Sequence, residues 1–188
     1  MDSSVQLHSP SFINSKTSVL PLEPGSPPPV SSQPFQIQLA ALGTADYVDS
    51  VSISSLPALQ SFTSNWRHAK FTSLSLHIFP TALAVKSPTT VRVCWVPANS
   101  AAMPAQILDV HGGECFCVGG PLHANSQIIV PAPLSNLNPT AKSPVTFLDT
   151  PKLLIASYPS PSPPAAPTCY AVIKGMVEFH SPLLQSSA

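Results

Sequence analysis

Residues able to bind a metal ion lie close together in one segment, between His111 and Cys117. Glu114, Cys115 and Cys117 follow the histidine, and all four side chains can be zinc ligands. Structural zinc sites usually join two pairs of closely spaced Cys or His residues, whereas this segment has one Cys-x-Cys and no second pair. Cysteine is also often a small buried hydrophobic residue. We therefore predict no metal site.

A catalytic cysteine is the second possibility. Cys94 or Cys115 would need a neighbouring histidine to act as a nucleophile. His68 and His77 are the candidates, but no local sequence signature of a nucleophile surrounds either cysteine. The chain also lacks a Gly-x-Ser-x-Gly elbow and a Walker-type phosphate loop, and its few carboxylates are scattered. We therefore predict no catalytic residues, no cofactor and no enzymatic activity.

Histidines are the side chains most able to change charge near neutral pH. The chain has six of them beside only eight lysines and arginines. His68 lies in the densest basic cluster, Trp-Arg-His-Ala-Lys at 66–70, and His180 ends the polar face of the last expected strand. From the residues alone, both are interpreted as ordinary surface histidines in preference to a charge switch.

Charge is scarce in the chain as a whole. Charged residues make up 9% of the 188 residues, against roughly 25% in an average protein. Eight acidic residues balance eight basic ones, so neither a basic arm nor an acidic tail is present. A surface with so little charge suggests that other chains cover much of it. A monomer with a Ser-, Thr- and Asn-rich surface is the alternative.

Cysteine usage and the termini bear on location. The four cysteines are interpreted as reduced, because Cys115 and Cys117 would share one face of a strand and could not readily bridge each other. The start of the chain has no signal-peptide pattern, and apolar runs such as 128–134 are too short to span a bilayer. We expect a soluble, cytoplasmic protein without a membrane partner.

The chain divides into an arm and one domain. Residues 1–34 are rich in Ser and Pro and contain Pro-Gly-Ser-Pro-Pro-Pro at 24–29, which predicts a flexible N-terminal arm. Residues 35–188 are expected to form a single all-β domain. Eight or nine short strands, most of them with alternating apolar residues, are expected there; they are centred near 35–39, 48–53, 74–80, 91–97, 114–118, 127–130, 152–157 and 169–180.

The connections between these strands are rich in Pro and Gly and contain no long helical pattern. One short helix is expected within 56–66 and one helical turn near 103–108. Many short strands with such connections are typical of a two-sheet sandwich. We predict an eight-stranded jelly-roll β-sandwich, which is common among capsid proteins.

Dispersed motifs over roughly 33–184 resemble the coat proteins of tymoviruses. The most specific is Val-Cys-Trp-Val-Pro-Ala-Asn-Ser at 93–100. The others are Gln-Pro-Phe-Gln at 33–36, Arg-His-Ala at 67–69, Pro-Ala-Gln-Ile at 104–107, Gly-Gly at 112–113 and 119–120, Asp-Thr-Pro-Lys-Leu-Leu at 149–154 and His-Ser-Pro-Leu at 180–183.

This resemblance implies a structural coat protein of a positive-strand RNA plant virus. It implies self-assembly of pentamers and hexamers into a T=3 icosahedral capsid around genomic RNA, in the virion and in the host cell cytoplasm. The family's inward-facing histidines fall on His68 and His180, which makes them RNA-contact candidates, with Arg67 and Lys70 of the same cluster as secondary candidates. Polyamines would neutralise much of the RNA. A monomeric β-sandwich that binds a ligand or carbohydrate is the alternative function.

Overall fold

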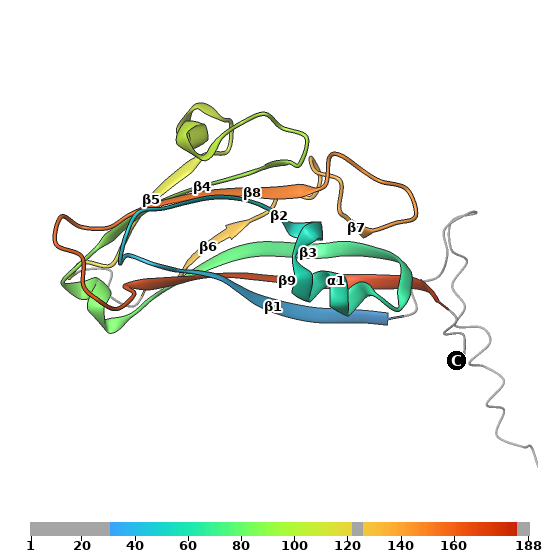
Figure 1. Cartoon of the computed structure of the whole chain (residues 1–188), viewed down its shortest axis with the longest axis horizontal. Coiled ribbons are helices and arrows are strands. Elements are labelled where there is room, and N and C mark those ends of the chain that lie inside the picture. Colours follow the sequence, from blue (N-terminus) through green and yellow to red (C-terminus); the bar gives the residue numbers. More distant parts are fainter. Residues whose placement is uncertain (1–30, 122–125, 184–188) are drawn as a thin grey trace, which may run out of the picture.

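The computed structural model describes residues 31–121 and 126–183, which form two antiparallel sheets packed face to face (Figure 1). In the first sheet the strand order is β1 (Ser31–Leu42), β9 (Cys169–Pro182), β3 (Trp66–Pro80) and β6 (Ile128–Pro131), and β7 (Thr140–Lys142) also pairs with β3. In the second sheet the order is β2 (Tyr47–Ser52), β8 (Pro151–Tyr158), β4 (Thr89–Pro97) and β5 (Glu114–Val118).

Eight of these strands follow the chain order of a jelly roll. The chain passes back and forth between the two sheets, so that neighbours in space come from distant parts of the sequence. The predicted eight-stranded jelly roll is therefore confirmed. The additional strand, β7, has three residues and lies in the long connection between β6 and β8.

The first strand begins earlier than predicted. β1 starts at Ser31, so residues 31–34 of the predicted arm belong to the sheet; the rest of the arm, residues 1–30, lies outside the described residues. Pro34 is tolerated because β1 stands at the end of the strand order, where a missing backbone N–H breaks no second ladder. A bulge between Gln38 and Ala40 changes which positions face the core, from the half-buried Phe35 and Ile37 before it to the buried Ala40 and Leu42 after it.

The two expected helical segments are present. α1 (Pro57–Thr63) begins with proline at its first turn, where the absent N–H has no helical partner to lose, and it buries Leu59. η4 (Pro104–Asp109) is a 3-10 helix with Ile107 buried. Shorter 3-10 turns, η2 (Ile53–Ser55) and η3 (Ala82–Val85), follow β2 and β3. None of the helices within 31–121 and 126–183 is long and apolar enough to cross a membrane.

A single main core fills the space between the sheets. Leu76, Ile78 and Ile173 of the first sheet meet Val93 and Ile155 of the second, and all are fully buried. Trp95 adds a hydrogen bond across this core, because its indole Nε1 donates to the carbonyl oxygen of Val130 at 3.2 Å. A buried Trp N–H needs such a partner.

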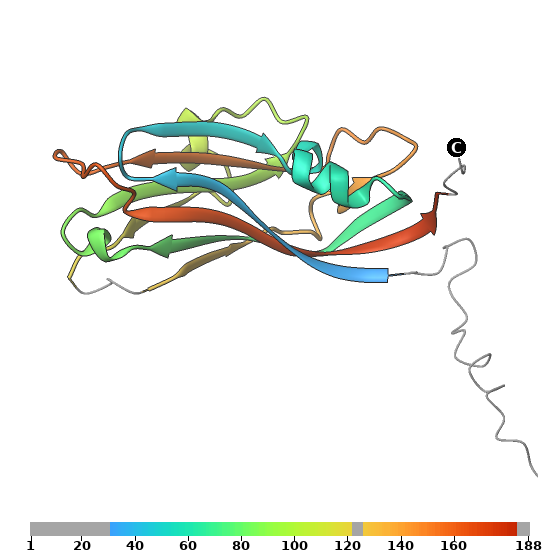
Figure 2. The same cartoon turned by 60° about the horizontal axis from the view of Figure 1, so that its bottom comes forward.

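The second sheet is buried on its outer side as well. Cys94, Val96, Leu154 and Ala156 point away from the main core and pack beneath Ile107 of η4. This second cluster explains why β8 is a nearly continuous buried run instead of an alternating one. Within the described residues, no helical segment lies over the outer face of the first sheet, which Figure 2 brings forward. That outer face is consequently the exposed broad surface of the sandwich.

The centre of the first sheet depends on a close contact at Gly175. A Cβ atom at this position would lie 2.5 Å from the carbonyl oxygen of Ser73 and 2.7 Å from the Phe35 ring. The Phe35 ring itself packs on Phe71, with centroids 5.9 Å apart. Glycine is thus required because β3 and the Phe35 ring occupy the space that a side chain would take.

We predict that Gly175→Ala destabilises the subunit by about 1–3 kcal/mol, the usual cost of forcing a methyl group into a packed core. Urea unfolding of the dissociated subunit measures the change. Phe35→Leu in the same chain is expected to recover part of the loss, because it removes one of the two clashing groups. An unchanged unfolding midpoint for Gly175→Ala would show that the contact can relax.

Candidate nucleic-acid interface

The two candidate histidines are direct neighbours in the first sheet. His68 of β3 stands opposite His180 of β9 in the antiparallel register, and Lys70 stands opposite Glu178 two pairs further on. Residues directly opposite in such a ladder have Cβ atoms about 5 Å apart. The sequence alone does not show that the two histidines are neighbours, because they are on strands far apart in the chain. We call His68 and His180 the histidine pair.

The histidine pair belongs to the outer face of the first sheet. Ala69, Phe71, Val177 and Phe179 alternate with the residues of this face and are buried in the main core. Lys70 shares the outer face with His68, whereas the exposed Arg67 alternates to the other side of β3. The basic cluster 66–70 is therefore divided between two surfaces, and His68 and Lys70 are the members that share one.

Charge on this face is sparse and mostly positive. Lys174 joins Lys70 and the histidine pair, and Glu178 is the one carboxylate among the described strand residues that point outward here. The neighbouring outward residues of β1 are uncharged, such as Gln36 and Gln38. Such a surface can form a few contacts with phosphate groups, and protonated imidazoles would add to them. It cannot neutralise a long polyanion.

His77 is a further residue of this face that sequence reasoning considered only as a partner for a catalytic cysteine. Its imidazole Nε2 lies 2.9 Å from Ser75 Oγ, and Gln127 contacts its Nδ1. Burial, together with the nearby positive charge of Lys174, lowers the pKa of His77 below its usual value. Its alternation with Leu76 and Ile78 places it on the outer face, and one of its partners, Gln127, comes from a segment 50 residues away.

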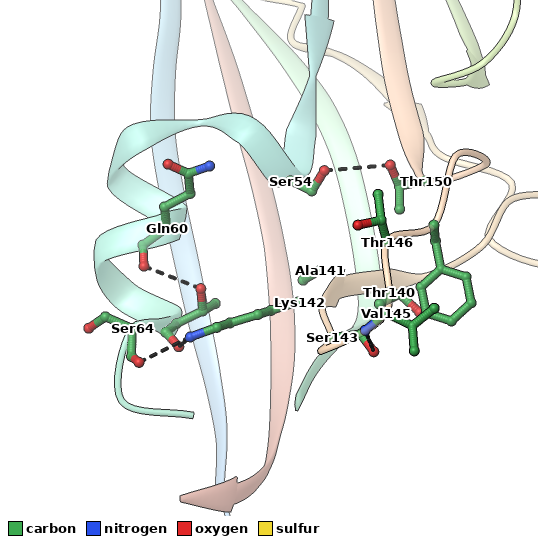
Figure 3. A pocket seen from close by; sticks show the side chains of 12 residues that line it. Ser54, Gln60, Ser64, Thr140, Ala141, Lys142, Ser143, Val145, Thr146 and Thr150 are labelled. Atoms are coloured by element: carbon green, nitrogen blue, oxygen red, sulfur yellow. Dashed lines mark hydrogen bonds between the residues drawn. The ribbon is translucent and has the colours of Figure 1, made fainter. Parts of the chain in front are cut away.

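A cavity of about 600 Å³ lies between α1 and residues 140–150 (Figure 3). Hydroxyl groups line much of it, including Ser54 and Thr150, whose side-chain oxygens are 3.5 Å apart. Lys142 Nζ donates to the carbonyl oxygens of Thr63 and Ser64 at 2.9 and 3.0 Å, at the end of α1. The lysine thus satisfies helix-terminal carbonyls. The cavity brings together no nucleophile and base.

The cysteines are separated from the histidines considered with them. Cys94 is buried in the second cluster, where its thiol contacts the backbone carbonyl oxygens of Trp95 and His111, and burial raises its pKa. Cys115 and Cys117 are exposed on β5 and carry free thiols. Nowhere in the part of the chain that the structure describes do three or more His, Cys, Asp or Glu side chains form a group able to hold a metal ion.

Comparison with known proteins identifies the family of this chain. The family model for the tymovirus coat protein matches residues 22–188. The capsid protein of Kennedya yellow mosaic virus is 51% identical over 176 residues, 94% of each chain, and that of Cacao yellow mosaic virus is 48% identical over 188 residues, the full length of both. Among solved structures, the Desmodium yellow mottle tymovirus chain has 50% identity and a TM-score of 0.83, covering 90% of this chain and 97% of that one.

These similarities extend over the whole sandwich and are far too high to reflect the fold alone. They decide between the two functions that the sequence left open, because the matched relatives are capsid proteins and not monomeric binding modules. The chain belongs to the tymovirus coat protein family, and it is a structural protein, not an enzyme, of the icosahedral capsids of positive-strand RNA plant viruses.

Proposed function

We propose that copies of this chain assemble as pentamers and hexamers into a T=3 shell that encloses single-stranded genomic RNA in the host cell cytoplasm. Membership of the tymovirus coat protein family carries this proposal. The low charge supports it, because the surface of an isolated subunit of this composition would be poorly solvated.

Exposed apolar side chains indicate where other copies would pack. Most of them are in three connections and not on the sheet faces: Leu83 and Val85 in η3, Met103 and Leu108 in and beside η4, and Val145, Phe147 and Leu148 between β7 and β8. Val145 and Leu148 are 64% and 66% exposed. Clusters of this kind mark protein–protein contacts in proteins that assemble. We assign residues 145–148 to a contact between subunits.

RNA contact is proposed for the outer face of the first sheet. His68 and His180 would bind phosphate oxygens when protonated, with Lys70 beside them and Glu178 as the carboxylate that faces them from β9. Two imidazolium groups directly opposite each other repel, and a phosphate between them would offset that repulsion. Because the net charge of the chain is zero, polyamines would have to supply most of the charge that neutralises the RNA.

We predict that Phe147→Ser combined with Leu148→Ser prevents formation of shells while leaving the subunit folded, because the exposed apolar contact is lost. Negative-stain electron microscopy of the expressed protein measures particles, and circular dichroism measures folding. Phe147→Leu combined with Leu148→Met keeps the contact apolar and is expected to give normal shells. If the wild-type chain gave only small soluble species, the capsid role itself would be contradicted.

We also predict that the subunit binds single-stranded RNA more tightly at pH 5.5 than at pH 7.5, because protonated imidazoles add positive charge to this face. His68→Gln with His180→Gln should remove this pH dependence and weaken binding at pH 5.5 about tenfold, since a hydrogen bond to a charged group contributes about 1.5 kcal/mol. Fluorescence anisotropy of a labelled oligonucleotide at pH 5.5 and 7.5 measures both effects.

The matched control is His111→Gln, which removes an imidazole from the surface beyond η4 and should leave the pH profile unchanged. A double variant of the histidine pair with the wild-type profile would show that other groups carry the pH dependence.

A further inference from the structure

A second group of side chains occupies the outer face of the first sheet, toward the far end of β3. It consists of Ser75, His77 and Phe79 from β3 and Lys174 from β9. Lys174 is paired with Ser75 in the sheet register, so all four side chains emerge on one side. His77 and Phe79 are nine and eleven residues beyond His68, which places them about 30 Å along the strand. The group is therefore separate from the histidine pair.

A chain of hydrogen bonds fixes the His77 ring. The amide nitrogen of Gln127 donates to Nδ1, so Nε2 carries the ring proton and donates to Ser75 Oγ at 2.9 Å. Ser75 Oγ in turn donates to the carbonyl oxygen of Lys174 at 3.4 Å. With the Gln127 amide nitrogen as donor to Nδ1, this pattern suits a neutral imidazole, because both nitrogens of a protonated ring would be donors.

The fixed His77 ring lies nearly parallel to its neighbour Phe79. The ring planes differ by 19° and the centroids are 6.0 Å apart. Lys174 Nζ lies over the Phe79 ring, 4.8 Å from its centroid. Both rings are half-buried: one face of each packs against the protein, and the other is accessible to solvent. We call these two rings, with the Lys174 ammonium, the aromatic platform.

An aromatic ring with a mobile cation beside it is a common arrangement at single-stranded nucleic-acid sites. The ring stacks with a base, and the cation binds the adjoining phosphate. Flat aromatic and amide groups on an exposed sheet face can stack with any base, since every base has a π-face.

We propose that His77, Phe79 and Lys174 form a second contact for single-stranded RNA, in which a base stacks on the platform and Lys174 binds the neighbouring phosphate. The proposal rests on the RNA-contact function proposed for this sheet face. It adds a site at which the base is bound, whereas the histidine pair meets phosphate.

The free energy of stacking a base on Phe79 exceeds that of the cation–π contact between Lys174 and Phe79 that the base would replace. A base stacked on Phe79 would displace the Lys174 ammonium from the ring. An exposed cation–π contact is worth about two- to fivefold in an equilibrium constant, and stacking a base on an aromatic side chain about five- to 100-fold. The displaced ammonium also gains a phosphate partner. The bound arrangement therefore outweighs the contact that it replaces.

The surroundings of His77 disfavour its protonation, because burial lowers its pKa. Lys174 is the charged group that faces His77, and it opposes protonation. The register neighbours of His77, Val172 on β9 and Ile129 on β6, carry no charge, and Gln127 is neutral. The platform contact should thus change less between pH 5.5 and 7.5 than that of the histidine pair.

Two probes separate stacking from charge in a binding experiment on the full-length, dissociated subunit. One is a labelled single-stranded RNA oligonucleotide, and the other is inorganic polyphosphate, which has phosphates but no bases. Phe79→Leu should weaken RNA binding about tenfold at both pH values and leave polyphosphate binding unchanged. Lys174→Gln should weaken binding of both probes about two- to threefold. Phe79→Tyr keeps the ring and should bind as the wild type does.

Controls make each outcome decisive. Lys86→Gln removes an exposed lysine at the end of η3, outside the strands of the first sheet, and should change neither affinity. Circular dichroism and the melting temperature confirm that each variant is folded. Wild-type RNA binding with no loss in either Phe79→Leu or Lys174→Gln would overturn the platform and leave the histidine pair in place. A wild-type subunit that binds no RNA would overturn the proposed RNA function and the platform together.

Discussion

The pairing of β3 with β9 is the interaction on which the rest of the structure depends. It runs from Trp66 opposite Pro182 to Pro80 opposite Cys169, along nearly the whole length of both strands. Side chains alternate across a strand, so a slip of one residue would exchange the two faces. The same register that buries Phe71, Ile173 and Phe179 therefore places His68 opposite His180 and the His77–Phe79 rings beside Lys174 on the outside.

Unequal coverage of the two sheets makes this outer face distinctive. The second sheet is packed on both sides, because η4 and its flanking residues lie over Cys94 and Leu154. The first sheet is packed on one side only within the described residues, and so it can carry histidines, lysines and half-buried rings that keep part of their contact with water. If a layer of apolar residues covered this face as well, each charged side chain on it would need a buried partner.

The sequence predicted what depends on local alternation and missed what depends on pairing. Strands such as β4 and β9 were located because apolar residues recur at every second position and proline ends them. β7 was missed because three residues, Thr140 to Lys142, are too few to show a period. The early start of β1 was missed because of Pro34. Proline is rare within a central strand, but an edge strand such as β1 tolerates it. The opposition of His68 and His180 follows from a register between residues 112 positions apart, which no local pattern contains.

We assign assembly and RNA contact to different parts of this chain. The low charge of the chain explains how the two functions can be separated. A coat protein that relied on a basic surface to collect RNA would repel its own copies unless RNA were present. This chain has no net charge, and the apolar residues proposed for subunit contacts are in connections such as 145–148, away from the outer face of the first sheet. Apolar contact between copies then needs no neutralising polymer. With the proposed subunit contacts and the proposed RNA contacts on different surfaces, substitutions on the sheet face should alter RNA content without preventing shells.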